Sequence, residues 1–184
     1  MGGAVVFIAI IVVIAIGVAV LFNNLVGRRQ LARNGWSDID VQLKRRADLI
    51  PQLVTTVKGY AAHERALFEE IAARRGAAMA AGDDRAQRAA AEGALAQPVS
   101  RLVALAEAYP DLKANQNFLD LQRQLAETED KIEMARRFYN GAVRELNTLV
   151  HSVPSNLVAG AFGFREEAYF EINDSDRAAP KIGG

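Results

Sequence analysis

The densest group of acidic side chains that could support acid–base chemistry lies in residues 127–133. General acid–base catalysis needs two carboxylates held at a controlled separation in a desolvated cleft. Here the carboxylates are interleaved with basic side chains, and Glu127 and Lys131 stand at positions i and i+4, as do Glu133 and Arg137. Pairs in this order stabilise a solvent-exposed helix. The run therefore predicts a solvated helical face rather than a catalytic pair.

A basic run, residues 44–46, lies between Asp40 and Asp48. Two interpretations of this run stay open. In one, a charge network holds the helix to its neighbour. In the other, the run extends a docking patch for lipid headgroups or an acidic partner that begins further upstream. The candidate lipid or partner contacts are Arg28, Arg29, Arg33, Lys44, Arg45 and Arg46.

The sequence lacks the residues that several other kinds of chemistry require. The chain has no cysteine and only two histidines, His63 and His151, which excludes thiolate chemistry and a three-histidine metal site within one chain. It also has no glycine-rich phosphate loop and no serine-nucleophile or zinc-protease motif. We expect no catalytic residues, no metal and no cofactor. Lys plus Arg and Asp plus Glu are 22 each, and this zero net charge argues against a nucleic-acid partner.

Residues 4–22 contain neither a charged nor a polar side chain. At about 1.5 Å per residue such a helix reaches roughly 28 Å, close to the ~30 Å hydrocarbon core of a bilayer. A cleaved signal peptide would have a shorter apolar run, a basic start and a small-residue cleavage site. The run therefore predicts an uncleaved transmembrane helix. Because the arginines all follow it, the positive-inside rule places the short N-terminus outside and the rest in the cytoplasm.

The remaining residues, 23–172, predict an antiparallel bundle of three or four long helices, and residues 173–184 a disordered tail. The clearest pattern covers residues 118–149, where apolar positions alternate steps of three and four residues and predict a left-handed packing seam. We expect Pro51 to kink or divide a helix and Pro98 to interrupt another. We also expect the apolar stripe beyond Pro51 to continue through Tyr60 to Ile71.

Single aromatic residues predict packing roles. Trp36 lies fourteen residues beyond the apolar run, too far for a membrane-interface residue, and is expected in a helix contact. Tyr139 falls on the packing seam, where its ring is expected in the core and its hydroxyl against a polar partner. Asp84 is expected to cap the N-terminus of a helix.

Three stretches together resemble the LemA family: WSDIDVQLKRRADLIPQLVTTVKGYAAHE (36–64), AYPDLKANQNFLDLQRQLAETEDKI (108–132) and ARRFYNGAVRELN (135–147). The resemblance includes a single apolar helix just before the first stretch and extends to GFREEAYFE (163–171). It implies a bacterial inner-membrane protein with a short outside N-terminus and a cytoplasmic helical bundle. It carries over no catalytic residues.

The sequence thus favours a membrane-anchored scaffold or adaptor over an enzyme. Its expected partners are the lipid bilayer, further copies of itself as a homo-oligomer, and membrane or cytoplasmic proteins that the sequence does not name. One alternative is a membrane-surface organiser whose arginines bind anionic lipid. A less favoured alternative is an enzyme that uses the bundle carboxylates or the segment 44–48, which would require them to converge in a closed pocket.

Overall fold

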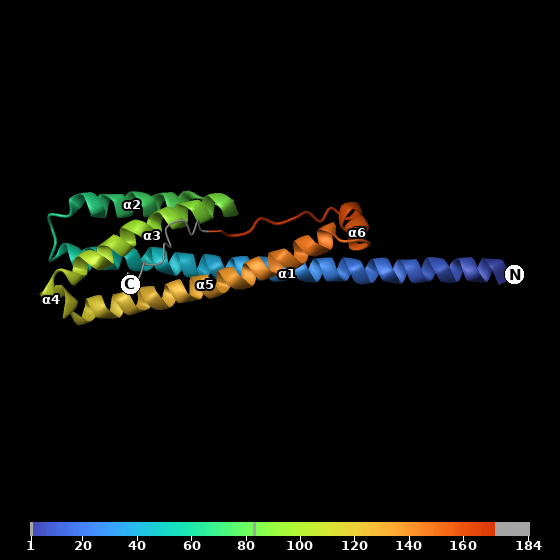
Figure 1. Ribbon diagram of the computed structural model, residues 1–184, viewed down its shortest axis with the longest axis horizontal. Helices are drawn as coiled ribbons and strands as arrows, with labels where there is room; N and C mark the ends of the chain where they lie inside the picture. Colours follow the sequence, from blue (N-terminus) through green and yellow to red (C-terminus); the bar gives the residue numbers. More distant parts are fainter. Residues whose placement is uncertain (1, 83, 172–184) are drawn as a thin grey trace, which may run out of the picture. The chain divides into compact units, whose positions relative to one another are not determined.

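The computed structural model describes residues 2–82 and 84–171, and within these ranges every regular element is a helix (Figure 1). The elements are α1 (Gly2–Lys58), α2 (Arg65–Ala80), α3 (Arg85–Glu107), α4 (Pro110–Lys113), α5 (Gln116–His151) and α6 (Ser155–Ala161). The all-α prediction is confirmed. The predicted tail, residues 173–184, lies outside the described residues, and the division of the chain at residues 22 and 172 stays a prediction.

The chain forms two compact units. Unit 1 comprises Met1–Asp38 and Ala135–Tyr169, and unit 2 comprises Ile39–Met134 and Phe170–Gly184. Helices α1 and α5 each contribute one segment to each unit. Each unit therefore has its own packing.

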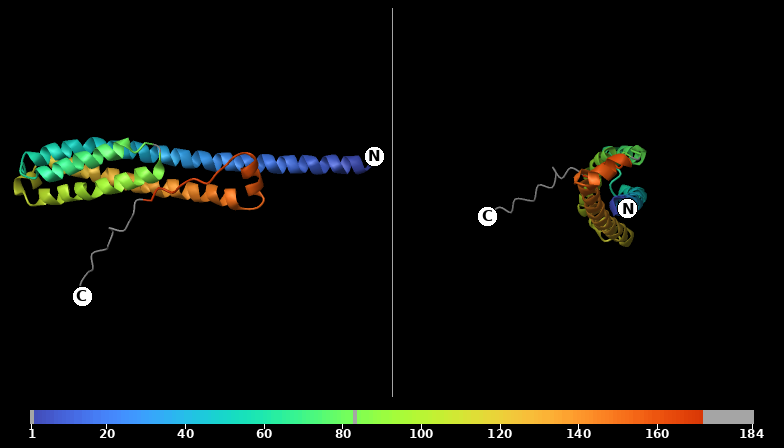
Figure 2. Two further views of the ribbon diagram at one scale, coloured as in Figure 1. Left: turned by 90° about the horizontal axis from the view of Figure 1, so that it is seen from above. Right: turned by 90° about the vertical axis from the view of Figure 1, so that its right-hand side faces the viewer.

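Unit 2 is a four-helix arrangement made from the end of α1, α2, α3 and the beginning of α5, as the two side views show (Figures 1 and 2). Successive helices run in opposite directions, which confirms the predicted antiparallel bundle within this unit. The core is continuous from one helix to the next, and its fully buried members include Ile50, Leu53, Ile71, Leu95 and Leu102. On α5, the predicted seam supplies Phe118, Leu121 and Leu125.

Helix α1 continues through Pro51 without dividing, so of the two outcomes expected there, a kink or a division, the division is wrong. Proline has no N–H to donate to the carbonyl four residues earlier, which here belongs to Ala47. In the structure, Arg75 Nε from α2 donates to that Ala47 oxygen at 2.6 Å. The long-range bond replaces the missing helical one, so the backbone of α1 needs no break at this position.

Two further expectations about helix ends are wrong. Helix α3 continues through Pro98, which is buried in its interior. Conversely, α1 ends at Lys58 and a turn precedes α2, so the stripe expected to run on through Tyr60 is broken; Tyr60 is 41% exposed. The turn places Ala61 in the core, and its N–H donates to the Val57 oxygen at 3.0 Å. Asp84 caps α3 as expected, accepting from the Gln87 N–H at 3.0 Å.

Unit 1 pairs the first part of α1 with the last part of α5, and α6 covers one end of this pair (Figures 1 and 2). The two long helices approach closely at Gly35, where an added Cβ would lie 2.9 Å from Phe138 Cδ1 and 3.0 Å from Tyr139 Cα. Trp36 packs beside Tyr139, with ring centroids 5.7 Å apart, as the sequence predicts.

The chain after α6 returns along unit 1 in extended form, and Tyr139 fastens it. The Tyr139 ring is fully buried and its hydroxyl donates to the Ala168 oxygen at 2.6 Å. Asn147 adds two bonds to the backbone of Glu167, donating to its oxygen at 3.0 Å and accepting from its N–H at 2.9 Å. The prediction of a core tyrosine with a polar partner is therefore confirmed.

Candidate functional site

The first turns of α1 carry an apolar surface that nothing in unit 1 covers. The large aliphatic and aromatic side chains from Val5 to Ile16 are each at least 50% exposed. By length and composition, α1 is the one helix among residues 2–82 and 84–171 that could cross a membrane. Exposed apolar patches of this size mark contacts with a membrane or a partner.

The covered part of the apolar run begins at Val18. Here α6 and the residues after it pack against α1, and the Phe22 ring contacts Phe162 and Phe164 edge to face with centroids 4.9 and 5.7 Å apart. The buried centre of this contact consists of Leu25, Leu146, Val158, Ala159 and Phe164. Val18, Leu21, Phe22 and Val26 are half-buried around it. The end of the apolar run thus belongs to the folded structure of unit 1.

The first predicted basic contacts follow directly on α1 and already have partners within unit 1. Arg28 forms an ion pair with Glu145 of α5, and the Arg29 guanidinium lies 4.6 Å from the centroid of the Phe164 ring. The latter geometry is a cation–π contact. Arg33 is exposed. Of these three arginines, Arg33 is therefore the most accessible to an external anion.

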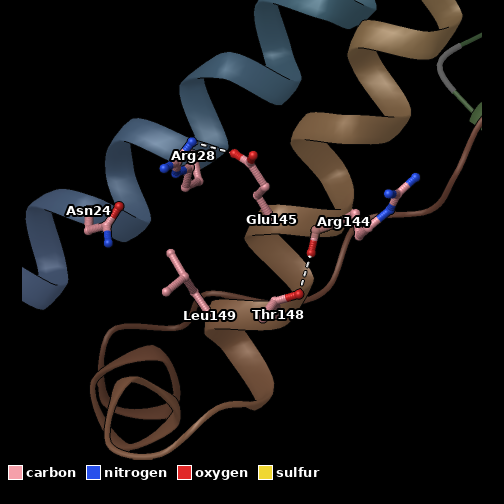
Figure 3. A pocket seen from close by; sticks show the side chains of 6 residues that line it. All are labelled: Asn24, Arg28, Arg144, Glu145, Thr148 and Leu149. Carbon is pink, nitrogen blue, oxygen red and sulfur yellow. Dashed lines mark hydrogen bonds and ion pairs between the residues drawn. The ribbon is translucent and has the colours of Figure 1, made fainter.

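A shallow pocket of about 300 Å³ lies beside Arg28, lined by Asn24, Arg28, Arg144, Glu145, Thr148 and Leu149. Figure 3 shows Glu145 directed at Arg28, while the Arg144 side chain points away from both. The charge of Arg28 is thereby compensated inside the pocket, and Thr148 donates its hydroxyl to the Arg144 backbone oxygen at 2.8 Å. The pocket is not organised as an anion site.

Arg46 lies in a different environment from its basic neighbours because it is buried in unit 2, with 2% exposure. It forms ion pairs with Glu92 of α3, which is 3% exposed, and with Glu129 of α5 at 3.0 Å. Arg88 extends the network, donating to Glu92 at 3.3 Å and to Asp40 at 3.1 Å. For Arg46, this arrangement supports the structural interpretation of the basic run rather than the docking one.

The network raises the pKa of Arg46. Burial on its own lowers this pKa, because it disfavours the charged guanidinium. The negative charges of Glu129 and Glu92, and the hydrogen bonds that both carboxylates accept from Arg46, outweigh that effect. Arg46 is therefore a permanent cation inside the bundle, and it joins three helices through its two carboxylate partners.

Lys44 and Arg45 are exposed on α1 of unit 2, so they retain the docking interpretation. Sequence reasoning missed Glu92, the buried partner of Arg46, because it lies in an alanine-rich stretch with no visible apolar face. It also missed α6 as a cover for Phe22. The available signal was the absence of charge from residues 152–164, together with their aromatic and aliphatic side chains.

The exposed apolar start of α1 and the helical packing of both units define the class of protein, which is a helical bundle whose first helix begins with an apolar segment. The family model for the LemA family matches residues 35–183, and the chain belongs to this family. Among curated proteins, the chain is similar to Magnetosome protein MamQ 2 and Magnetosome protein MamQ 1 of Paramagnetospirillum magneticum (strain ATCC 700264 / AMB-1). Each is 25% identical over 175 residues, covering 82% of this chain and 64% of the relative.

A third relative is Magnetosome protein MamQ of Magnetospirillum gryphiswaldense, which is 23% identical over 189 residues, covering 88% of this chain and 70% of the relative. The chain spans just under two thirds of the length of the two Paramagnetospirillum proteins. The family match and the long apolar helix together support a membrane-associated helical protein.

Proposed function

We propose that the protein is a membrane-anchored helical scaffold or adaptor, which crosses the bilayer once with residues 4–22 and binds other proteins, or copies of itself, through the helical surfaces of its two units. It acts by binding rather than by catalysis. Its buried charges support this view, because Arg46 and its carboxylate partners hold helices together.

The observation that carries the anchor is the bare apolar surface of α1. Side chains from Val5 to Ile16 are at least half exposed, whereas an amphipathic helix of a water-soluble protein turns its apolar stripe inward. The same helix continues without interruption into buried positions such as Leu25 and Ala32. Removal of residues 1–22 as a signal sequence would take away Val18, Leu21 and Phe22, which pack in unit 1. This supports an anchor that stays attached.

The arginines of α1 support an orientation. Residues 1–3 carry no basic side chain, and Arg28, Arg29 and Arg33 follow the apolar run. The positive-inside rule then places the N-terminus outside and both units in the cytoplasm of a bacterial cell, at the inner membrane. An externally added protease that digested unit 2 in intact cells would contradict this orientation.

Self-association can be tested with single cysteines, because the chain has none of its own. Suitable positions are the exposed apolar residues Met79, Leu119 and Met134 of unit 2. In native membranes, a homo-oligomeric scaffold should give an oxidised, disulfide-linked dimer at one of these faces and not at the others. Confinement to a bilayer raises the effective concentration enough for weak contacts to register.

The same positions carrying a photo-crosslinking side chain test for other protein partners. The scaffold proposal predicts a discrete adduct that depends on the face carrying the probe. A protein that gives neither dimers nor adducts at any of these positions, and that runs as a monomer after gentle solubilisation, would contradict it.

A second candidate function is a membrane-surface organiser that binds anionic lipid. The observation in its favour is that Arg33 and Arg144 of unit 1 are exposed, with Arg33 close behind the apolar run. Each such arginine near an anionic surface contributes about 1 kcal/mol. The full chain carrying Arg33→Gln and Arg144→Gln should then lose its preference for vesicles that contain phosphatidylglycerol over vesicles of phosphatidylcholine alone. An unchanged lipid preference removes this candidate.

A further inference from the structure

Helix α6 has two sides with different surroundings. Val158 and Ala159 are buried against Leu25, on the side that packs onto α1. By contrast, Leu157 of the helix is 71% exposed, Val153 just before it is 79% exposed and Phe162 just after it is 56% exposed. Val153 and Leu157 are largely uncovered within unit 1, and Phe162 keeps more than half of its surface exposed although its ring contacts Phe22.

The stretch that contains α6 carries no charge. Residues 152–164 include neither acidic nor basic side chains, and the charged groups begin again at Arg165. A water-exposed loop normally carries polar and charged residues, because large exposed apolar patches promote association. The absence of charged residues and the exposure of the three apolar side chains together indicate that these side chains lie in apolar surroundings.

The length of the uncovered part of α1 indicates what those surroundings are. Residues 2–17 are exposed throughout, and at about 1.5 Å per residue they reach roughly 24 Å, less than the ~30 Å hydrocarbon core of a bilayer. The apolar run fills the core only when Val18–Phe22 are included. At that level, α1 is already in contact with Phe162 and Phe164. A bilayer that surrounds Phe22 therefore also meets α6.

The arginines that follow Phe22 on α1 are consistent with Phe22 lying at the boundary of the hydrocarbon core. Arg28 and Arg29 lie about 9 Å and about 10.5 Å along the helix from Phe22, and the Arg29 guanidinium lies over the Phe164 ring. Arginine side chains bury their stems beside apolar groups and keep the guanidinium at the polar headgroups. Figures 1 and 2 both show α6 beside α1, at the end of the stretch in which α1 runs alongside α5.

We propose that α6 is a second membrane contact, an interfacial element whose Val153, Leu157 and Phe162 side chains enter the boundary between lipid headgroups and acyl chains beside Phe22. The inference rests on the proposed membrane anchor. The occupant is lipid, because this surface is continuous with the apolar surface of α1. The element fixes the depth of the span and the direction in which α1 leaves the bilayer.

The test uses the full-length chain with a spin label on one introduced cysteine, reconstituted in vesicles of phosphatidylcholine and phosphatidylglycerol in equal parts. Three positions are compared: Leu157→Cys in α6, Ile14→Cys in the bare part of α1, and Met134→Cys as an exposed apolar control in unit 2, 59% exposed. The readout is the accessibility of each label to oxygen, which concentrates in lipid, relative to a water-soluble nickel complex. Circular dichroism confirms that each variant is folded.

We expect labels at residues 14 and 157 to favour oxygen several-fold over the label at residue 134. A residue 157 label that behaves like the residue 134 label, while residue 14 stays in lipid, overturns the role of α6 and leaves the anchor intact. A residue 157 label that both reagents fail to reach shows that protein covers α6, which also overturns the inference. If the residue 14 label is itself in water, the anchor fails and the role of α6 fails with it.

Discussion

Arg75 Nε on α2 donates a hydrogen bond of 2.6 Å to the backbone oxygen of Ala47 on α1, the carbonyl that Pro51 leaves without its helical donor. The bond links a local defect in one helix to the packing of its neighbour. It explains how α1 runs from Gly2 to Lys58 through a proline without dividing. It also gives Arg75 a role that its half-exposed position does not suggest.

Replacing Arg75 should therefore destabilise unit 2 through the backbone of α1. Arg75→Met leaves the Ala47 oxygen without a donor, and we expect a loss of about 1–2 kcal/mol in the free energy of unfolding. In a Pro51→Ala background, the new N–H of residue 51 can donate to Ala47, so the same change at Arg75 should cost less. A double-mutant cycle measured by chemical unfolding in detergent checks this. Equal losses in the two backgrounds would contradict the assigned role.

The buried ion pairs of Arg46 should be strongly coupled to stability. Arg46→Met removes the charge partner of buried Glu92, and breaking such a pair from one side costs about 3–5 kcal/mol. The matched control is Arg45→Met, next along the chain but exposed, for which we expect a change within about 0.5 kcal/mol. Thermal unfolding followed by circular dichroism compares the two. Similar melting temperatures for both variants would remove the structural role of Arg46.

The raised pKa of Arg46 determines how the contribution of Arg46 to the free energy of unfolding depends on pH. A group whose pKa is higher in the folded state contributes stability that is complete below its unfolded pKa and is lost as pH rises through the folded value. For Arg46, that loss lies in strongly alkaline solution. We expect the Arg46 guanidinium to stay charged across neutral pH, so the NMR signals of its nitrogens in the wild-type protein should not shift there. A titration of those signals near neutrality would contradict the assignment.

Gly35 should be sensitive to substitution, because α1 and α5 lie close together there. A Cβ at this position would lie 3.0 Å from the Tyr139 backbone, which cannot move away as a flexible side-chain end can. We expect Gly35→Ala to cost about 1–3 kcal/mol through overpacking. Gly27→Ala is the control on the same helix, because no atom lies within 4 Å of its Cβ position. There, higher helix propensity should leave stability unchanged or raise it by up to about 1 kcal/mol. The measurement is chemical unfolding of both variants.

The Tyr139 hydroxyl should hold the returning segment of unit 1 in place. Tyr139→Phe keeps the ring but removes the bond to the Ala168 oxygen, for an expected loss of about 1 kcal/mol. Hydrogen exchange measured by mass spectrometry should then speed up in residues 164–169. Tyr169→Phe, at an exposed position, is the control and should leave exchange unchanged. Unchanged protection in the Tyr139 variant would show that other contacts hold this segment.

Much of the helical architecture was predictable because its signals are local or periodic. The apolar run, the seam on α5 and the Asp84 cap are each readable within a few turns of sequence, and the structure contains them. The two internal prolines do not end their helices, although proline is a helix breaker by its local chemistry. A proline weakens a helix locally, but Arg75, distant in sequence, supplies the hydrogen bond that Pro51 cannot make.

The predicted site residues differ in burial, and the basic run by itself does not predict which of them is buried. Lys44, Arg45 and Arg46 are consecutive, yet only Arg46 lies on the buried face of α1, where Glu92 of α3 pairs with it. The contact between Phe22 and α6 likewise joins residues far apart in the chain. Such pairings depend on tertiary packing, and no spacing within one segment predicts them.

The central claim is that the apolar start of α1 stays attached and lodges in the bilayer. The most direct measurement is the distribution of the full-length chain after cell membranes are washed with alkaline carbonate, with its mass determined to establish that residues 1–22 are present. The account predicts that the intact chain stays with the membrane pellet and leaves it only with detergent. Recovery of the intact chain in the carbonate supernatant, or of a chain shortened by the apolar run, would contradict it.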